Sequence, residues 1–380
     1  MGSGDQDWMR RALSLARRAL GRTSPNPAVG AVLVRNGEMV GWGATHRAGG
    51  PHAEVVALRR AGEFARGATL YVTLEPCSHY GRTPPCCDAL IRAGVARVVC
   101  AVQDPSPHVH GTGLARLRDA GIQVEVGLFA EEARRLNEAF FTYIERGRPF
   151  VLLKYAISLD GKTATRTGDS RWISSEASRR HVHGLRRVYD AVMCGVGTVL
   201  ADDPQLTPRP RGRARVGFPW RVVVDSHART PVTASILKEA RRSRVLIATT
   251  DQAPLDRVRA LEAAGAQVKL LPAADGRVDV GALLAELGRM EITSLLLEGG
   301  GELAAAFLQR GLVDKLLAFV APVLVGGRAA PSPVMGEGVA KMADAVRLER
   351  VRVRRFGEDV AIEAYPVRVN VCVRAEGSEG

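Results

Sequence analysis

The sequence is poor in several features that would place a chain quickly in a class. Of its 380 residues only six are cysteine and 5% are aromatic, and only six of the 53 basic residues are lysine. No run of 18 apolar residues occurs, which excludes an ordinary membrane-spanning helix. The second half has no nucleophile elbow, Walker loop or GxGxxG motif. We therefore expect a cytoplasmic globular protein whose chemistry lies in other motifs.

The composition is basic, with a formal net charge of +13. Because arginine binds phosphates and carboxylates through a bidentate fork, this charge favours anionic partners. The alternative is a composition biased toward arginine, with the charges scattered over the surface. The densest basic stretch, residues 208–215, lacks aromatic residues and so offers no stacking platform for single-stranded nucleic acid. Residues 8–20 form a basic amphipathic pattern, which we interpret as a surface helix.

The first half alternates strand and helix patterns. Residues 28–44 read as a hairpin around Asn36-Gly37, a favoured tight turn. Three further strands and four helices follow: strands at 68–76, 97–102 and 122–128, and helices at 52–65, 86–93, 113–120 and 130–145. Such alternation indicates an α/β fold in which helices cover a sheet.

The pattern restarts near residues 146–149, so the sequence predicts two domains, residues 1–147 and 148–368, and a loose tail at 369–380. In the second domain we expect a helix at 175–188 and a closing antiparallel pair at 346–356 and 359–365. The other expected strands lie at 149–158, 190–197, 220–226, 244–249, 267–272 and 294–300.

Half of the cysteines crowd into one loop, "PCSHYGRTPPCC" at residues 76–87. A disulfide, a metal site and chance are the three explanations. A reducing cytoplasm disfavours the disulfide. Upstream, "PHAEVVAL" at residues 51–58 places His52 and Glu54 at the start of a helix. His-x-Glu followed by Pro-Cys is the zinc-deaminase signature, and it favours a metal site.

The chemistry of deamination accounts for this spacing. A catalytic Zn²⁺ takes three protein ligands, here His52, Cys77 and a second thiol, and keeps one position for the water that it acidifies. Glu54 can then carry a proton without ligating the metal. The usual Cys-x-x-Cys spacing fails, so Cys86 and Cys87 are both candidates for the second thiol and His79 is a rival ligand. A closed structural zinc site with four of these residues is the alternative.

A second ligand loop is predicted in the sequence "LLLEGGGELAAAFL", residues 295–308. A strand runs into three glycines that open a helix, and backbone N–H groups at such a helix start bind phosphate. The alternative is a plain strand-to-helix turn. Glu298 beside the glycines favours a ligand loop.

Several longer stretches resemble the bifunctional deaminase/reductase family of riboflavin biosynthesis. In the first half these are residues 23–34, 76–86 and 104–122; in the second they include 154–164, 168–174, 183–209, 222–226 and 295–303. The resemblance covers about residues 8–366. It implies an N-terminal zinc-deaminase α/β/α sandwich and a C-terminal domain similar to dihydrofolate reductase.

The resemblance also implies roles for individual residues. It makes His52, Cys77 and Cys86 the zinc ligands, with Glu54 catalytic and Cys87 outside the site. Asn26 and His46 would line the deaminase substrate pocket; without the resemblance they read as a turn residue and a loop histidine. The reductase substrate positions would be Ser170, Arg186, Leu206, Arg209 and Glu298. The NADPH positions would be Ala156, Trp172, Thr198, Asp202, Ser226, Gly300, Gly301, Glu302, Leu303, Ala304, Ala305 and Ala306.

The resemblance implies two consecutive reactions on a phosphorylated pyrimidine. Zinc-dependent hydrolysis would remove an amino group from 2,5-diamino-6-(5-phosphoribosylamino)pyrimidin-4-one, and NADPH would then reduce the ribosyl chain to ribityl. Lys154 and Asp202 are candidates for polar roles near the reacting sugar. We expect a homo-oligomer with no nucleic-acid partner. The rival hypotheses are a nucleic-acid-editing zinc deaminase with a basic accessory domain, and a non-enzymatic, zinc-stabilised nucleotide-binding protein.

Overall fold

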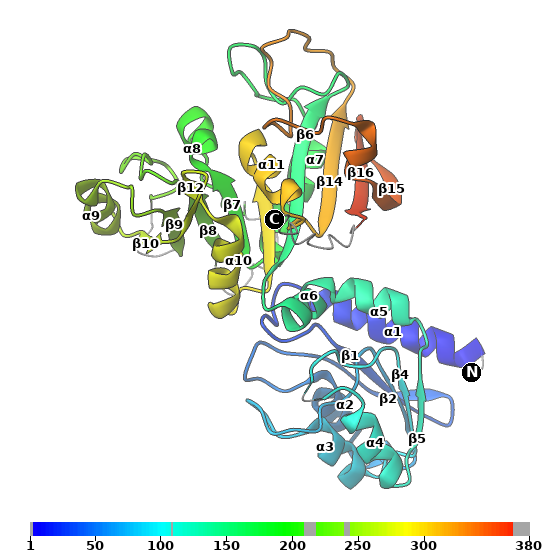
Figure 1. Cartoon of the computed structure of the whole chain (residues 1–380). Helices are drawn as coiled ribbons and strands as arrows, with labels where there is room; N and C mark the ends of the chain where they lie inside the picture. The colour runs from blue at the N-terminus through cyan, green and yellow to red at the C-terminus, as the bar shows by residue number, and fades with distance from the viewer. Residues whose placement is uncertain (1–2, 108, 209–217, 239–243, 368–380) are drawn as a thin grey trace, which may run out of the picture.

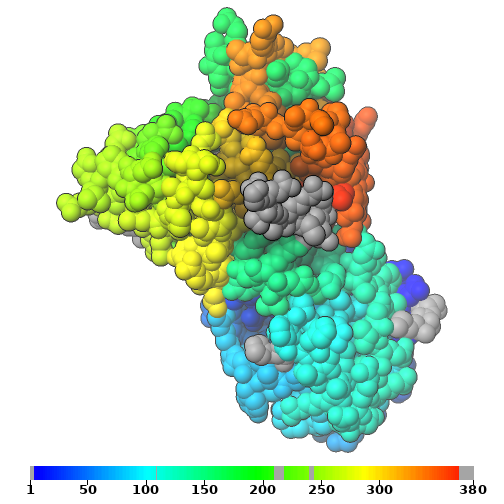
Figure 2. All heavy atoms as spheres, viewed as in Figure 1, coloured from blue at the N-terminus to red at the C-terminus, as the bar shows by residue number. Residues whose placement is uncertain are grey.

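The chain folds into two lobes, each built around its own β-sheet (Figures 1 and 2). The computed structural model describes residues 3–107, 109–208, 218–238 and 244–367. Arg209 and the predicted tail at 369–380 lie outside these residues. None of the helices in the described ranges is long and apolar enough to cross a membrane.

The N-terminal lobe holds a five-stranded sheet in the order β2-β1-β3-β4-β5. Its strands are β1 (Gly30–Arg35), β2 (Glu38–Ala44), β3 (Thr69–Val72), β4 (Arg97–Cys100) and β5 (Gln123–Val126). Its helices are α1 (Ser3–Ala19), α2 (Ala53–Ala61), α3 (Cys86–Ala93), α4 (Thr112–Asp119), α5 (Ala130–Leu136) and α6 (Glu138–Arg146), with a 3-10 turn at Gly62–Ala65. Helices α1, α5 and α6 cover one face and α2, α3 and α4 the other (Figure 1), which confirms the α/β/α sandwich.

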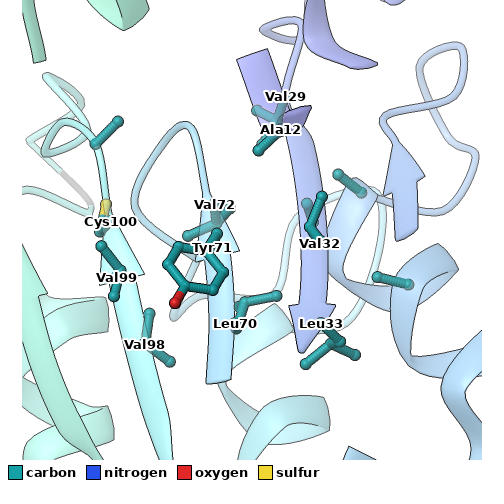
Figure 3. Packing of buried hydrophobic residues seen from close by; sticks show 14 of the residues in the cluster. Ala12, Val29, Val32, Leu33, Leu70, Tyr71, Val72, Val98, Val99 and Cys100 are labelled. Carbon is teal, nitrogen blue, oxygen red and sulfur yellow. The ribbon is translucent and has the colours of Figure 1, made fainter. Parts of the chain in front are cut away.

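The predicted hairpin is confirmed as β1–β2, and the residues of its turn explain where the chain reverses. Asn36 and Gly37 both have positive φ, as a tight turn requires. Strand β1 is buried from Gly30 to Val34, and the strands and helices beside it close an apolar core around it (Figure 3). The apolar face of α1, with Met9, Ala12 and Leu13, packs into the same core.

The helix expected over residues 130–145 is instead two helices, so that prediction was wrong in its continuity. Asn137 separates α5 from α6. Its side-chain amide accepts a hydrogen bond from the Ala28 N–H at 2.8 Å and donates one to the Ala28 carbonyl at 3.0 Å. This buried amide satisfies the backbone of a distant loop, and the local pattern of the helix does not reveal such a contact.

The C-terminal lobe holds a nine-stranded sheet in the order β10-β9-β8-β7-β13-β6-β14-β16-β15. Its strands are β6 (Phe150–Ser158), β7 (Ala191–Gly195), β8 (Trp220–Val224), β9 (Val245–Thr249), β10 (Gln267–Leu270), β13 (Ser294–Glu298), β14 (Lys315–Ala321), β15 (Leu348–Phe356) and β16 (Asp359–Pro366); β11 (Ala273–Ala274) and β12 (Arg277–Val278) form a separate pair. Its helices are α7 (Glu176–Val188), α8 (Val196–Asp202), α9 (Leu255–Ala263), α10 (Val280–Arg289) and α11 (Gly301–Gln309), with a 3-10 turn at Met342–Asp344. Pairings from β10 to β14 are parallel, and β16 and β15 close the sheet antiparallel.

Two details of the second lobe differ from the sequence prediction. Strand β14 was missed, although it pairs with β6 and β16 in the middle of one half of the sheet. Its seven residues directly follow a helix and a short turn, so no alternating pattern marks it. The strand expected at 190–197 ends at Gly195, where α8 begins. The closing antiparallel pair is confirmed as β15 and β16.

Helix α6 lies between the two lobes (Figure 1). Phe141 on this helix is buried in the N-terminal core. Glu138 on the same helix accepts hydrogen bonds from Lys315 Nζ at 3.0 Å and from the Tyr365 hydroxyl at 2.7 Å, and both donors belong to the second sheet. A second contact joins Ser24 to Asp190 at 2.6 Å. The lobes therefore share a polar junction.

Candidate active sites

Three potential metal ligands converge at the first turns of α2 and α3. His52 is the residue before α2, Cys86 is the first residue of α3, and Cys77 lies in the loop after β3. His52 Nδ1 is 3.3 Å from Cys86 Sγ and 3.6 Å from Cys77 Sγ. The three ligand atoms lie within 4.8 Å of one another, and they form the one such group among the described residues.

These distances fit a zinc ion. Tetrahedral zinc with Zn–N near 2.0–2.1 Å and Zn–S near 2.3 Å places nitrogen and sulfur about 3.6 Å apart. The donor set of one imidazole and two thiols is also one that zinc prefers. Three protein ligands leave one position for water, as a catalytic site requires and a closed structural site does not.

Two further side chains are held against the ligand group. Thr83 lies 3.3 Å from His52 Nε2, so its hydroxyl can fix the imidazole with Nδ1 directed at the thiols. Glu54, in the first turn of α2, is 3% exposed. Burial raises the pKa of Glu54 to about 7, against opposing effects of His52 and of a hydrogen bond with Cys86. The Glu54 carboxyl thus lies beside the ligand group in an apolar setting.

The thiols have different environments. A hydrogen bond with the Cys86 side chain, reinforced by His52, lowers the pKa of Cys77 to about 4. The same pairing, with burial, raises the pKa of Cys86 well above its usual value. Zinc binds the thiolate form of cysteine, so a metal held by this pair would displace the thiol proton of Cys86.

The rival ligands lie away from this group. Cys87 is buried and directs its thiol to the Pro76 carbonyl at 3.2 Å and the Gly113 carbonyl at 3.5 Å. His79 is exposed. The alternative of a closed, four-ligand site with either residue finds no support in this arrangement.

The sequence analysis missed Glu75, the buried residue two positions before Cys77. Its carboxylate accepts four backbone N–H bonds and so holds Asp104 and the start of α4 next to the loop that carries Cys77; the donors are Asp104, Gly111, Gly113 and Leu114. A carboxylate near the end of the mostly apolar stretch 68–76, which the sequence analysis expected to be one strand, is the signal that could have indicated such an anchor.

In the second lobe, the register of parallel strands brings two predicted site residues together. Lys154 on β6 lies directly opposite Glu298 on β13. The Arg186 guanidinium on α7 forms a bidentate ion pair with the Glu298 carboxylate, with Nε–Oε1 at 2.7 Å and Nη2–Oε2 at 3.0 Å. Lys154 Nζ is 3.9 Å from Glu298. Burial lowers the pKa of Lys154, while Arg186 holds the pKa of Glu298 down against its burial.

The predicted glycine loop lies beside α8. Gly299 and Gly300 have φ of +80° and +88°, a region that favours glycine. A Cβ on Gly299 would meet the Thr198 hydroxyl at 3.0 Å, so the backbone runs close past this residue. The Gly300–Ala306 segment forms this turn and most of α11. Nearby, the Ser170 hydroxyl lies 3.4 Å from Asp202, which joins a predicted substrate position to a predicted cofactor position.

The remaining predicted residues are scattered around these groups. Trp172 is exposed under the Arg179 guanidinium, Ser226 accepts a hydrogen bond from the Val278 N–H, and Ala156 lies on β6. Leu206 is buried with positive φ. In the first lobe, Asn26 is half-buried and His46 is exposed. None of these contacts tests a ligand role, so their roles stay predictions, as does that of Arg209.

Fold and site together define a zinc-type deaminase joined to a reductase. Residues 3–102 match the cytidine and deoxycytidylate deaminase zinc-binding region, and residues 149–362 match the RibD C-terminal domain. The chain is 45% identical over 359 residues to riboflavin biosynthesis protein RibD of Actinobacillus pleuropneumoniae, with 94% of each chain covered, and 45% identical to that of Escherichia coli, with 94% and 98% covered. The chain belongs to the RibD family of bifunctional deaminase/reductases.

Solved structures agree with this assignment. The fold is similar to RibD of Acinetobacter baumannii, with a TM-score of 0.86 at 40% identity, covering 96% of this chain and 99% of the other. It is also similar to a diaminohydroxyphosphoribosylaminopyrimidine deaminase/5-amino-6-(5-phosphoribosylamino)uracil reductase of Thermotoga maritima, with a TM-score of 0.83 at 36% identity and coverage of 96% and 99%. The predicted family, fold class and cofactors, zinc and NADPH, are confirmed at the level of the family.

Proposed function

We propose that this chain carries out both steps on one phosphorylated pyrimidine: hydrolytic deamination of 2,5-diamino-6-(5-phosphoribosylamino)pyrimidin-4-one and reduction of the ribosyl chain of the product. The convergence of His52, Cys77 and Cys86 beside the buried Glu54 carries the first half of the proposal. The T. maritima relative, named for both activities, supports the second half.

In the deaminase site the chain's own residues hold and move a proton. Zinc bound to His52, Cys77 and Cys86 supplies a Lewis acid that activates water. Glu54, whose buried carboxyl lies within hydrogen-bond reach of Cys86, takes the proton from the water and delivers it to the leaving amino group. One water is consumed and one ammonia is released. Asn26 and His46 contact the pyrimidine substrate.

In the reductase site the chain aligns two ligands. NADPH supplies the hydride, so the protein's task is orientation. The Gly300–Ala306 segment, with Thr198 and Asp202, would hold this cofactor. On the other side of the reductase site, Arg186 and Glu298, joined by their bidentate ion pair, bind the substrate together with Ser170, Leu206 and Arg209. Lys154, buried against Glu298, takes a polar role beside the reacting sugar.

Product mass tests this function directly. The full chain, loaded with zinc, is incubated with the diaminopyrimidine with and without NADPH. We expect an amino group replaced by oxygen in both samples, and two added hydrogens only in the sample with NADPH. An unchanged substrate mass in both samples, from a protein with bound zinc, would overturn the proposal.

We further propose that the protein works in the cytoplasm as a homo-oligomer without nucleic acid. The five cysteines in the described ranges are all free thiols, as in a reducing compartment. The outermost strand β15 exposes Val351 at 56% and Val353 at 64%, and a second copy of the chain could cover them. Sedimentation analysis tests the assembly. A wild-type monomer at micromolar concentration would contradict it.

A further inference from the structure

A groove lined by arginines lies at the β2 edge of the N-terminal sheet, between α1 and α2. Its volume is about 1080 Å³. Six arginines line it, three of them from α1, and we call it the arginine groove: Arg10, Arg11, Arg18, Arg22, Arg47 and Arg60. The other lining residues used below are Asp7, Trp42, Thr45, His46 and Val56.

Most of this positive charge is not neutralised. Arg10 pairs with Asp7 at 3.0 Å, and Asp7 is the one acidic residue in the lining. Among the described residues no carboxylate forms an ion pair with four of the other lining arginines, which are Arg11, Arg18, Arg22 and Arg47 and are all exposed. Such charges on facing walls of a concave surface concentrate an anion between them.

Two observations indicate that the groove is a formed site and not a chance hollow of the surface. The Arg60 guanidinium stacks 3.3 Å from the centre of the Trp42 ring and donates to the Trp42 carbonyl at 2.7 Å, which fixes the α2 wall to β2. Thr45 is 6% exposed, and its buried hydroxyl has no hydrogen-bond partner in the part of the chain that the structure describes. Buried hydroxyls without a partner are rare in folded proteins.

The groove adjoins the segment that carries the first zinc ligand, although none of the three ligands lines it. His46 lines it, and the His46 N–H donates to the Pro51 carbonyl, next to His52. Val56 also lines it, one turn along α2 from His52, or about 6 Å along the helix axis. An anion in the groove would therefore lie beside the first turn of α2, the helix that His52 directly precedes.

We propose that the arginine groove binds a phosphate monoester. Several arginine forks around one tetrahedral dianion match phosphate better than a carboxylate, which one fork satisfies. Two sources share this chemistry: the phosphoribosyl end of the deaminase's own substrate, which rests on the proposed function, and a separate phosphorylated metabolite, which does not.

Single-stranded nucleic acid fits this groove less well. Such ligands need aromatic faces on which bases stack. Trp42 is the one large aromatic residue in the lining, and Arg60 covers its ring. The groove thus offers charge without a stacking platform, which favours a small phosphorylated ligand.

Calorimetric titration of the full, zinc-loaded chain with ribose 5-phosphate tests the site. The variant Arg18→Ala/Arg47→Ala removes one lining arginine of α1 and one of the loop that joins β2 to α2. The control Arg17→Ala removes the neighbouring exposed arginine of α1, which does not line the groove. We expect the double variant either to bind one molecule of ribose 5-phosphate fewer per chain than wild type, or to bind it at least tenfold more weakly. The control is expected to bind ribose 5-phosphate as wild type does. Equal binding by all three proteins, or no binding by wild type, would overturn the proposal.

Deamination kinetics then separate the two sources. If the groove holds the substrate's phosphate, the KM for the pyrimidine rises about tenfold or more in the double variant and kcat changes little. If it holds a separate metabolite, ribose 5-phosphate binding is lost while KM is unchanged. This binding readout needs no activity, so it stands if the proposed reaction fails. Displacement of ribose 5-phosphate by a short RNA at equimolar concentration would overturn the small-ligand proposal.

Discussion

At the scale of single residues, the deaminase site depends on one carboxyl group that stays close to the metal group without joining it. Glu54 is buried and lies within hydrogen-bond reach of Cys86. Glu54 takes this position because it follows His52 by two residues at the start of α2. A substitution of Glu54 can therefore remove the proton transfer and keep metal binding.

The substitution Glu54→Gln is expected to abolish deamination and to retain zinc. The amide keeps the shape of the side chain but cannot carry the proton, and loss of a general acid–base group typically costs 10²- to 10⁴-fold in rate. Metal analysis and ammonia release on the purified variant check this result. Turnover near wild type, or loss of the metal, would remove Glu54 from the proposed mechanism.

Adjacent thiols in α3 give a second prediction at this scale. Cys86→Ser is expected to lose zinc, because Cys86 Sγ is 3.3 Å from His52 Nδ1. Cys87→Ser is expected to keep it, because the Cys87 thiol is directed at the carbonyls of Pro76 and Gly113. Zinc content of the two variants, measured side by side, decides the ligand. The reverse pattern would shift the ligand assignment by one residue.

At the scale of elements, the loop between Cys77 and Cys86 does more than connect two ligands. Thr83 in this loop lies 3.3 Å from His52 Nε2. Another loop residue, Arg82, bonds Glu291 of the second lobe at 2.7 Å. The loop therefore holds the metal group from one side and contacts the reductase lobe from the other.

Thr83→Val is expected to weaken zinc binding about tenfold while the fold is retained, because outer-shell partners of a ligating histidine typically contribute 10- to 100-fold. Ser78→Ala is the control, since Ser78 in the same loop bonds Thr112 instead of His52. Competition with a zinc chelator measures both affinities. Equal zinc affinity in the two variants would show that Thr83 does not orient the imidazole.

The contact between α7 and β13 in the second lobe gives a prediction for the reductase half. Arg186→Lys keeps the charge beside Glu298 but loses the fork, so we expect about a tenfold loss or more in reductase kcat/KM with deamination unchanged. Arg180→Lys, at an exposed position on the same helix, is the control. Steady-state reductase assays compare them, and indistinguishable kinetics would remove Arg186 from the substrate side.

At the scale of the whole molecule, helix α6 serves both lobes. Phe141 packs into the deaminase core, and Glu138 accepts hydrogen bonds from Lys315 and Tyr365 of the reductase sheet. The predicted boundary between residues 147 and 148 falls directly after this helix. A cut there divides two cores cleanly but removes a carboxylate from the largely buried Lys315.

Separated fragments test this junction. Residues 1–147 are expected to deaminate alone, because the complete metal group lies within them. Residues 148–380 are expected to reduce the deaminated product but to melt several degrees below the reductase transition of the intact chain, because Lys315 keeps only Glu363 as its ionic partner. Thermal melts with and without NADPH measure this difference. Equal melting temperatures would show that α6 contributes nothing to the second lobe.

Much of the deaminase half followed from local sequence. His52 and Glu54 lie two residues apart at the start of α2, and Cys77 directly follows a proline in the loop after β3, so short-range patterns predict both the chemistry and its position. The hairpin around Asn36-Gly37 and the helix at Cys86–Ala93 were confirmed for the same reason. Local turn and capping preferences decide such features without distant contacts.

Tertiary structure alone decided the features that depend on long-range contact. The local pattern left Cys86 and Cys87 both open as the second thiol, and only the family resemblance favoured Cys86; the packing of α3 directs the Cys86 thiol to His52 and the Cys87 thiol to backbone carbonyls. The break at Asn137 depends on Ala28, more than 100 residues earlier in the chain. The arginine groove joins the first helix to residues beyond the first hairpin. Local patterning determines elements and motifs, whereas the choice of neighbours across the chain depends on how complete elements pack.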